Sequence, residues 1–512
     1  MRLSKNLLAG FANSICSALV NLIVVPLYLK YLGIEAYGLI GFFVTTQALL
    51  QLLDMGLAPT INREVARCSA SGNLKEAGKL LHSLAVVCWS VAGIIALLIV
   101  ALAPLIAEYW LQSKQLSPHA IEHAVMLMGL VIACRWPIGL YQGALIGAQR
   151  LTVLSSVSIA MVTFGNLGAV AVLIFVSPTI EAFFIWQACA GLLYAATMRW
   201  AAWGVIGRLK EIRFDIDELK RIWRFSAGMS GIAFSGLVFT QLDKIILSKM
   251  VGLMEFGHYM LATAAVSGLY FLITPMLNVV YPRLSALVVT GDIEKLTDLY
   301  RLGTRLLATV LFPVAMLLVV FPQDLVYVWT GNQAIAASVA PVIALLAIGT
   351  ALHGVMHFPY ALQLAYGVTR LPLTINAILI VVWVPLIIFF ALKYGALGGA
   401  MAWLVFHVLY VLLGTWLTHR RLLKGVGRRW LFQDVGVPFG LSILVGIVGH
   451  YAIQGAEYSA YVKLVCGGGL GLVVVLLSLS VSPQFGMAVL NGLGWKKSIA
   501  TTEISLISTG KK

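Results

Sequence analysis

The feature that most constrains this chain is a succession of apolar segments, each about 20 or more residues long and bounded by charges or turn residues. A helix of that length covers about 30 Å, the thickness of the hydrocarbon core of a bilayer. Transmembrane strands would instead alternate over about 10 residues each, and the sequence lacks that pattern. Only 11% of the residues are charged, against about 25% in soluble domains. We therefore predict an all-α polytopic membrane protein.

The apolar segments predict fourteen transmembrane helices. Six precede a basic linker, at about 7–29, 37–60, 80–107, 120–147, 153–176 and 181–206. Eight follow the linker, at about 225–250, 256–281, 302–322, 335–365, 373–392, 396–418, 434–453 and 460–481. We interpret the basic N-terminus as leading into the first span, because the apolar run after it is longer than the core of a cleaved signal peptide.

One stretch of the sequence recurs with an almost constant shift of 219 residues. The matched positions are Lys30 and Lys249, Gly33 and Gly252, Gly38 and Gly257. Further matches join 71–76 to 290–295, and 147–151 to 367–371 with one residue inserted. Matches spread over about 120 residues indicate a duplicated unit. Since each copy holds six helices, an even number, both copies enter the membrane from the same side as parallel repeats about an axis along the membrane normal.

The repeat divides the chain into predicted domains. These are an N-terminal six-helix lobe at 1–207, a cytoplasmic amphipathic linker at 208–224, a C-terminal six-helix lobe at 225–419, two additional transmembrane helices at 434–482 and a cytoplasmic tail at 483–512. The last two helices lie outside the duplication. They are therefore expected as an addition to the second lobe.

The distribution of basic residues predicts the orientation, since Lys and Arg are retained in the cytoplasm. Placing the N-terminus inside puts most of the 35 Lys and Arg residues on the cytoplasmic side. The other face keeps only Lys30, Lys114, Lys249, Lys393 and Lys463. Both termini are thus predicted to be cytoplasmic. The net charge of +15 then reflects this topology and contact with anionic lipid, and no nucleic-acid partner is expected.

Signals for an enzyme are weak. The connecting segments are too short for a soluble catalytic domain, and no Walker A motif is present. Asp215 and Asp217 form a DxD, which in sugar transferases can hold a metal and a nucleotide diphosphate. We interpret Asp215 instead as the cap of the linker helix, with Glu218 completing a capping box. The six cysteines have no paired spacing, so we predict no disulfide, metal or cofactor.

Several short motifs resemble those of bacterial polysaccharide exporters. They are the turn at 33–38, LDMGL at 53–57, REVA at 63–66, GAQR at 147–150 and QLDKIIL at 241–247. Over its whole length the chain resembles a Wzx-type O-antigen or capsule repeat-unit flippase, in the superfamily that also holds MATE multidrug exporters and lipid II flippases. The resemblance implies two six-helix lobes in a V around a central cavity that opens alternately to each side. It also implies structural motif roles for Gly33, Gly38, Asp54, Arg63 and Arg150.

The function implied by the resemblance is transport of undecaprenyl-diphosphate-linked oligosaccharide repeat units across the bacterial inner membrane by alternating access, for O-antigen, capsule or exopolysaccharide synthesis. The implied partners are the lipid-linked oligosaccharide, membrane lipid, a polysaccharide polymerase and a chain-length protein. One alternative is a cation-coupled multidrug antiporter, but its relatives carry an acidic residue in helix 1, where this chain has Asn13 and Asn21. The other is a membrane polymerase or lipid-linked glycosyltransferase, whose large external loop or convergent acid and base groups are absent from the sequence.

An anionic headgroup needs a cationic passage. Ionisable residues inside a membrane cost about 2.5 to 3.5 kcal/mol each on insertion scales, so those present are candidates for function. Arg135, near the middle of helix 4 beside Pro137, is the first candidate for binding the diphosphate, and Lys244 in helix 7 is the second. A salt bridge or a carbonyl partner remains the structural alternative for Arg135, and snorkelling to the interface the alternative for Lys244.

Three further residues are candidates for ion coupling. Asp243 and Lys244 are neighbours in sequence and so lie about 100° apart around a helix, which predicts that they face different directions. His353 and His357 lie four residues apart on one face of helix 10 and titrate between pH 5 and 8 when unperturbed. We expect coupling through Asp243 or through this histidine pair, with structural packing as the alternative for each.

Overall fold

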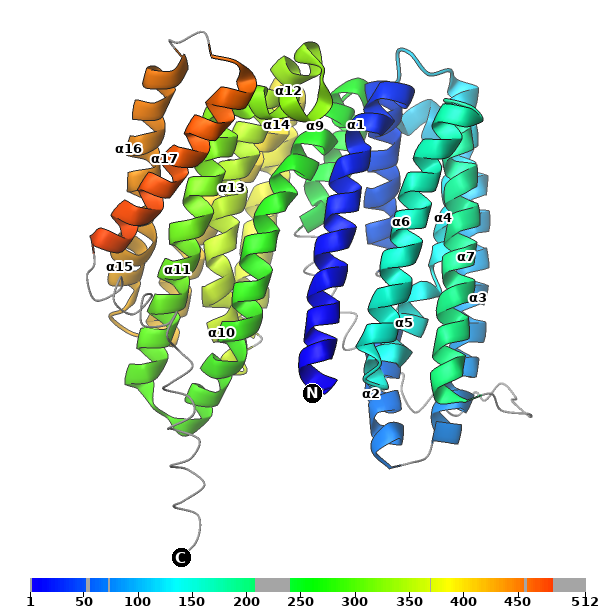
Figure 1. Ribbon diagram of the computed structural model, residues 1–512, viewed down its shortest axis with the longest axis horizontal. Coiled ribbons are helices and arrows are strands. Elements are labelled where there is room, and N and C mark those ends of the chain that lie inside the picture. Colours follow the sequence, from blue (N-terminus) through cyan, green and yellow to red (C-terminus); the bar gives the residue numbers. More distant parts are fainter. Residues whose placement is uncertain are drawn as a thin grey trace, which may run out of the picture. The chain divides into compact units, whose positions relative to one another are not determined.

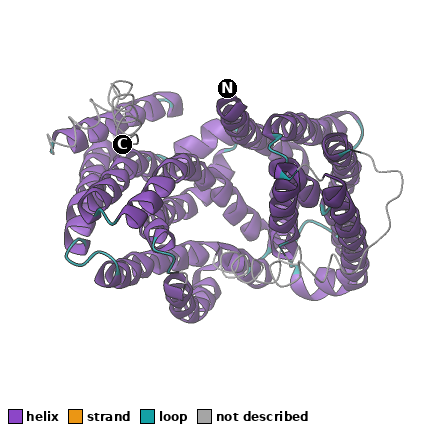
Figure 2. Ribbon diagram, turned by 90° about the horizontal axis from the view of Figure 1, so that it is seen from below, coloured by secondary structure: helices purple, strands orange, loops and turns teal. Residues whose placement is uncertain are grey.

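The computed structural model describes residues 2–51, 56–71, 74–207, 240–368, 370–454 and 458–481. These residues form helices joined by loops, and no strand occurs among them (Figure 2). Eleven of the helical segments are long and apolar enough to cross a membrane. Two of the eleven are pairs of helices joined through a glycine, and the described helix over 240–250 lies within the span predicted at 225–250. The prediction of an all-α membrane protein with about fourteen transmembrane helices is confirmed.

Figure 1 shows the helices in chain order. The first half contains α1 (Arg2–Leu50), α2 (Leu57–Ala70), α3 (Leu74–Leu105) with a π-helical end (Ile106–Trp110), α4 (Pro118–Arg135), α5 (Ile138–Gly147), α6 (Leu151–Phe175) and α7 (Ile180–Ile206). The second half contains the helix over 240–250, α9 (Leu253–Val266), a 3₁₀ turn (Ser267–Leu269), α10 (Tyr270–Thr290), α11 (Ile293–Val320), α12 (Pro322–Thr330), α13 (Gln333–Ala365) and α14 (Arg370–Arg421). The end contains α15 (Gly427–Arg429), a π-helical turn (Trp430–Val435), α16 (Gly436–Gln454) and α17 (Ala460–Ser480).

The helices group into two compact units. Unit 1 comprises Met1–Ala265, Trp329–Val342 and Asn376–Trp403, and unit 2 comprises Val266–Val328, Ile343–Ile375 and Leu404–Lys512. Within unit 1, α4 packs between α3 and α7, and α6 packs against both α1 and α7 (Figure 1). The predicted lobes 1–207 and 225–419 remain predictions. The predicted linker 208–224 and the tail from 483 lie outside the described residues.

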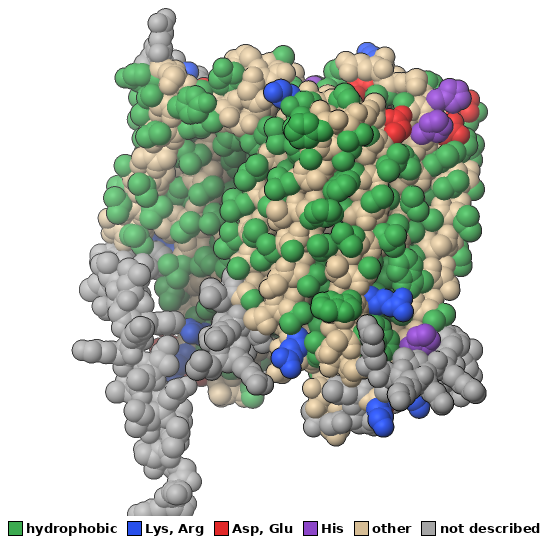
Figure 3. Space-filling model, turned by 45° about the vertical axis from the view of Figure 1, so that its right-hand side comes forward, with side chains coloured by type: hydrophobic (Ala, Val, Ile, Leu, Met, Phe, Trp, Pro, Cys, Tyr) green, Lys and Arg blue, Asp and Glu red, His purple; other side chains and the backbone are tan. Residues whose placement is uncertain are grey.

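Side chains follow the pattern of a membrane protein. On the face shown in Figure 3, apolar side chains cover the middle of the helices and charged side chains gather near their ends. More Lys and Arg side chains are visible at one end than at the other. This asymmetry is the basis of the predicted orientation.

Two predicted helices are each divided in the structure. The helix predicted at 37–60 ends at Leu50, and the amphipathic α2 starts a separate helix after Gly56, whose φ of 66° is left-handed. The helix predicted at 120–147 is interrupted at Trp136 and Pro137, so that α4 ends and α5 begins there. Pro137 has no N–H to continue the hydrogen-bond ladder.

The turn expected at 33–38 is a backbone break within α1. Gly33 has φ 82° and ψ 174°, a conformation that is essentially restricted to glycine. The first half of α1 also contains Pro26, which cannot donate a hydrogen bond to the carbonyl of Leu22. The indole N–H of Trp329 donates to that carbonyl instead, at 2.9 Å. Both irregularities of α1 are thus accommodated by the local structure.

Matched residues of the two repeats contact each other within unit 1. A methyl group on Gly38 would lie 2.5 Å from the carbonyl oxygen of Leu253, and one on Gly257 would lie 2.3 Å from the carbonyl oxygen of Ile34. Gly38 and Gly257 are matched at the shift of 219, and Ile34 and Leu253 are separated by the same shift. The contact is therefore reciprocal, as across a two-fold axis.

The same relation continues along the two helices. A methyl group on Gly41 would lie 2.4 Å from Cγ of Met260, again 219 residues away. A methyl group on Gly38 would also lie 3.3 Å from the backbone nitrogen of Gly257. Because the contacts of Gly38 with Gly257 and of Gly41 with Met260 increase together along both helices, the second half of α1 and α9 run parallel there. Inverted repeats would reverse this order at the two helices, and the parallel arrangement of the whole repeats stays a prediction.

The close approach gives a stability prediction. Gly38→Ala should destabilise the protein by about 1 to 3 kcal/mol, because the added methyl group overpacks against the backbone of Leu253. Gly93→Ala in α3 is the matched control, since no atom lies within 4 Å of the new methyl group and alanine is the better helix former. Thermal unfolding in detergent measures both, and an unchanged Tm for Gly38→Ala would contradict the close contact.

The two C-terminal helices pack against α11 in unit 2. A methyl group on Gly446 of α16 would lie 2.9 Å from Cγ of Met316, and one on Gly467 of α17 would lie 2.8 Å from a methyl carbon of Leu317. At the start of this region, Nε of Arg301 donates to the carboxylate of Asp434 at 2.7 Å. Small residues and one partly buried ion pair therefore attach the C-terminal region to α11.

Candidate functional site

Arg135 is the last residue of α4 and is partly buried. One of its terminal N–H groups donates to the side-chain oxygen of Gln187 on α7 at 2.5 Å, and Gln187 is only 4% exposed. The guanidinium carbon lies 5.7 Å from the ring centroid of Phe43 in α1. Arg135 therefore lies among three helices of unit 1, within the membrane span Pro118–Gly147.

No carboxylate pairs with Arg135 in the part of the chain that the structure describes. Its stem lies against the backbone of α7, because a methyl group on Gly191 would lie 3.0 Å from Cγ of Arg135. The expectation that Arg135 lies in the middle of one continuous helix is wrong, since the break at Trp136 and Pro137 ends α4 directly after it. The side chain nevertheless points into the helix bundle.

The interior around α1 and α4 to α7 contains further polar side chains. The hydroxyl of Tyr28 donates to Oδ1 of Asn166 at 3.1 Å, which joins α1 to α6. The hydroxyl of Tyr194 on α7 donates to Ser158 at 2.9 Å and accepts from the amide of Gln142 at 3.2 Å. These side chains satisfy one another inside an otherwise apolar bundle, as buried polar groups must.

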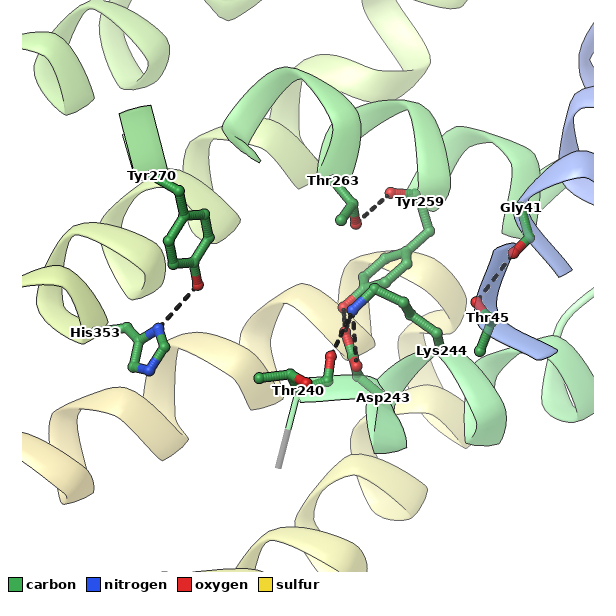
Figure 4. Close-up of polar contacts among 9 residues, drawn as sticks. All are labelled: Gly41, Thr45, Thr240, Asp243, Lys244, Tyr259, Thr263, Tyr270 and His353. Atoms are coloured by element: carbon green, nitrogen blue, oxygen red, sulfur yellow. Dashed lines mark hydrogen bonds and ion pairs between the residues drawn. The ribbon is translucent and has the colours of Figure 1, made fainter. Parts of the chain in front are cut away.

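Asp243 and Lys244 form a buried ion pair, which the sequence did not predict. Nζ of Lys244 lies 3.1 Å from Oδ1 of Asp243, and the two residues are 9% and 2% exposed. The expectation that they face different directions is wrong, because the long lysine side chain turns back along the helix. Its Nζ also donates to the carbonyl of Thr240 at 2.9 Å (Figure 4).

Two aromatic side chains contact the ion pair of Asp243 and Lys244. The hydroxyl of Tyr259 donates to Oδ2 of Asp243 at 2.6 Å (Figure 4), and Nζ of Lys244 lies 5.9 Å from the ring centroid of Trp403. Asp243 and Lys244 thus compensate each other's charge. This arrangement leaves Lys244 poorly placed to bind a second anion.

His353 and His357 belong to a larger cluster in unit 2. Their ring centroids lie 4.8 Å apart, and the ring of His407 on α14 lies 4.9 Å from that of His353. The hydroxyl of Tyr270 lies 2.8 Å from Nδ1 of His353 (Figure 4). No sequence spacing links His407 to the other two histidines, because the three come together only when α13 packs against α14.

Comparison with known proteins gives the family. The family model for polysaccharide biosynthesis proteins matches residues 3–288. This chain belongs to that family. A relative from Shigella flexneri that is assigned as an O-antigen transporter is 23% identical over 398 residues, which cover 76% of this chain and 91% of the relative.

Two solved structures that share the fold are a lipid II flippase and a multidrug transporter. The lipid II flippase MurJ in an inward closed conformation has a TM-score of 0.70 at 14% identity, over 92% of this chain and 98% of that one. An inward-facing multidrug MATE transporter has a TM-score of 0.61 at 15% identity, over 80% of this chain and 98% of that one. The predicted resemblance is therefore confirmed at the level of the polysaccharide biosynthesis family, and the fold is shared with the MurJ flippase and a MATE transporter.

The described motif residues lie on or just before helices of unit 1. Gly33 and Gly38 make the backbone break and the close contact described above. Arg63 on α2 and Arg150, just before α6, are exposed, whereas Asp54 lies outside the described residues. The structural roles of these motif residues stay predictions.

The helix that carries Arg63 also holds an exposed ion-pair network. The guanidinium of Arg67 lies 2.9 Å from Glu64 and 2.6 Å from Glu76. The carboxylate of Glu64, together with that of Glu76, raises the pKa of Arg67. The network joins α2 to the start of α3.

The described residues include no group of three or more His, Cys, Asp or Glu side chains arranged to hold a metal ion. The six cysteines, all within this part of the chain, are not joined in disulfides.

Proposed function

We propose that this protein flips undecaprenyl-diphosphate-linked oligosaccharide repeat units across the bacterial inner membrane, by alternating access and with both termini in the cytoplasm. The observation that carries the proposal is Arg135, an intramembrane arginine held by the neutral side chain of Gln187. Its charge is not neutralised by a carboxylate among the described residues. The Shigella relative, assigned as an O-antigen transporter, supports the class of substrate.

The chemistry of the substrate explains the role of this arginine. The isoprenoid tail of a lipid carrier stays in the bilayer, whereas the diphosphate and the sugars must cross it. The planar guanidinium fork can make two parallel charge-assisted hydrogen bonds to a phosphate. Arg135 can therefore hold the headgroup during its passage while the tail remains in lipid.

Alternating access also needs a ligand or ion that binds two states with different affinity, since equal affinity shifts no equilibrium. Of the two predicted coupling sites, the geometry favours the histidines over Asp243. Protonation of Asp243 would leave the buried charge of Lys244 without its partner. We propose that a proton binds the cluster of His353, His357 and His407, which faces the hydroxyl of Tyr270.

The implied protein partners, a polysaccharide polymerase and a chain-length protein, remain part of this proposal. They would receive the repeat units on the outer side of the membrane.

Reconstitution in liposomes tests the proposal. Fluorescent lipid-linked glycan is placed in the outer leaflet, and an added glycosidase reports how much glycan has become inaccessible. We expect protein-dependent protection of the glycan. Dye efflux without movement of the glycan would instead indicate the antiporter alternative and would overturn the flippase assignment.

A further inference from the structure

We infer that Gln187 is a positioning residue that orients Arg135 for an anionic headgroup without neutralising it. The inference rests on the proposed function. Gln187 is not ionisable, so the criterion of charge inside the membrane did not select it in the sequence. Gln187 lies inside the apolar helix α7 and is 4% exposed. In the described part of the chain, its side-chain oxygen is the hydrogen-bond acceptor for the guanidinium of Arg135.

The side chain of Gln187 is a neutral amide. A buried guanidinium must have hydrogen-bond acceptors, and a carboxylate would supply both acceptors and an opposite charge. The amide oxygen of Gln187 supplies an acceptor alone. Arg135 is thereby held in place, and its positive charge stays available to a ligand.

The bond to Gln187 uses only part of the hydrogen-bonding capacity of the Arg135 guanidinium. A guanidinium carries five N–H donors, and Gln187 accepts from one terminal N–H group of Arg135. A single such bond leaves another pair of parallel N–H bonds on the fork, which is the arrangement that a phosphate binds. A glutamate at position 187 would instead compete directly with the phosphate for the fork.

The rest of the environment limits how Arg135 can move. Gly191, one turn beyond Gln187 on α7, allows the stem of Arg135 to lie against the helix backbone. The ring of Phe43, 5.7 Å from the guanidinium carbon, borders the group from α1. With the stem confined by α7 and α1, the bond to Gln187 determines the direction of the fork.

The decisive variant is Gln187→Glu, which keeps the size of the side chain and adds a negative charge. A salt bridge to Arg135 should leave the Tm in detergent equal to or higher than that of the unmutated protein. Transport of fluorescent lipid-linked glycan should fall at least about tenfold, since the arginine is then neutralised. If Arg135 were purely structural, the same variant would keep both its stability and its transport.

A second variant tests the positioning role without adding a charge. Gln187→Met removes the acceptor at similar volume, so the fork loses its orientation while its charge remains. We expect the substrate density at half-maximal rate to rise about tenfold, with the maximal rate largely kept. This variant also keeps the inference testable if Gln187→Glu does not insert.

The matched control is Gln333→Glu, the same substitution at an exposed position at the start of α13. We expect it to transport at the unmutated rate, because it changes the net charge equally but lies at a helix end. Full transport by both position-187 variants would overturn the inference while leaving the flippase assignment intact. Absence of glycan transport by the unmutated protein would overturn the flippase assignment itself.

Discussion

Arg135→Ala should insert and fold normally but lose most of its transport, about 10- to 100-fold, whereas Arg135→Lys should retain part of it. Alanine removes the charge and the donors that hold the diphosphate. Lysine restores a point charge but not the planar fork with two parallel hydrogen bonds. The liposome assay with lipid-linked glycan measures the rates, and fluorescence-detected chromatography measures the amount of folded protein.

The structure gives a reason why folding should survive this change. The described residues contain no carboxylate that would be left unpaired, and Gln187 loses one hydrogen bond. Arg429→Ala, at an exposed arginine of α15, is the control for loss of a positive charge. If Arg135→Ala flips glycan at the unmutated rate, Arg135 does not bind the phosphate. Lys244, the second candidate from the sequence, would then have to leave its ion pair with Asp243 to take that role.

The fold was predictable because its signals are long and repetitive. Apolar length alone indicates spans, and the shift of 219 residues relates Gly38 to Gly257, which meet in the structure. The helix breaks were harder to predict. A proline such as Pro137 can be accommodated within a transmembrane helix or can end it, and the neighbouring helices decide between the two.

Of the residues in the candidate site, only the ionisable ones could be predicted from the sequence. Arg135 was identified because a charge inside a membrane is costly, but its partner Gln187 is a neutral residue in an apolar run and carries no such signal. His407 joins His353 through tertiary packing. The predicted direction of Lys244 is wrong because the Cα–Cβ direction around a helix does not determine where the end of a four-carbon side chain lies.

The buried pair of Asp243 and Lys244 gives the largest expected effect on stability. Asp243→Asn or Lys244→Met alone should destabilise the protein by about 3 to 5 kcal/mol, because each leaves a buried charge without its partner. The double variant should recover most of this loss, since no unpaired charge remains. Thermal unfolding of the four proteins in detergent gives the coupling between the two changes.

An exposed pair provides the comparison. Nζ of Lys295 lies 2.7 Å from Asp292, but the lysine side chain is 76% exposed. The hydrogen bond from Lys295 lowers the pKa of Asp292, yet solvent screens the interaction, so Lys295→Met should change the Tm little.

The double variant also separates a structural from a coupling role for the buried pair. If the pair only supports the fold, Asp243→Asn with Lys244→Met should transport glycan at close to the unmutated rate and respond equally to an imposed pH gradient. Coupling would then reside elsewhere, in agreement with the histidine cluster. If the double variant folds but its transport no longer responds to the gradient, Asp243 takes part in coupling and the structural assignment is wrong. Single variants as stable as the unmutated protein would contradict the ion pair itself, because a buried charge cannot lose its partner without a penalty.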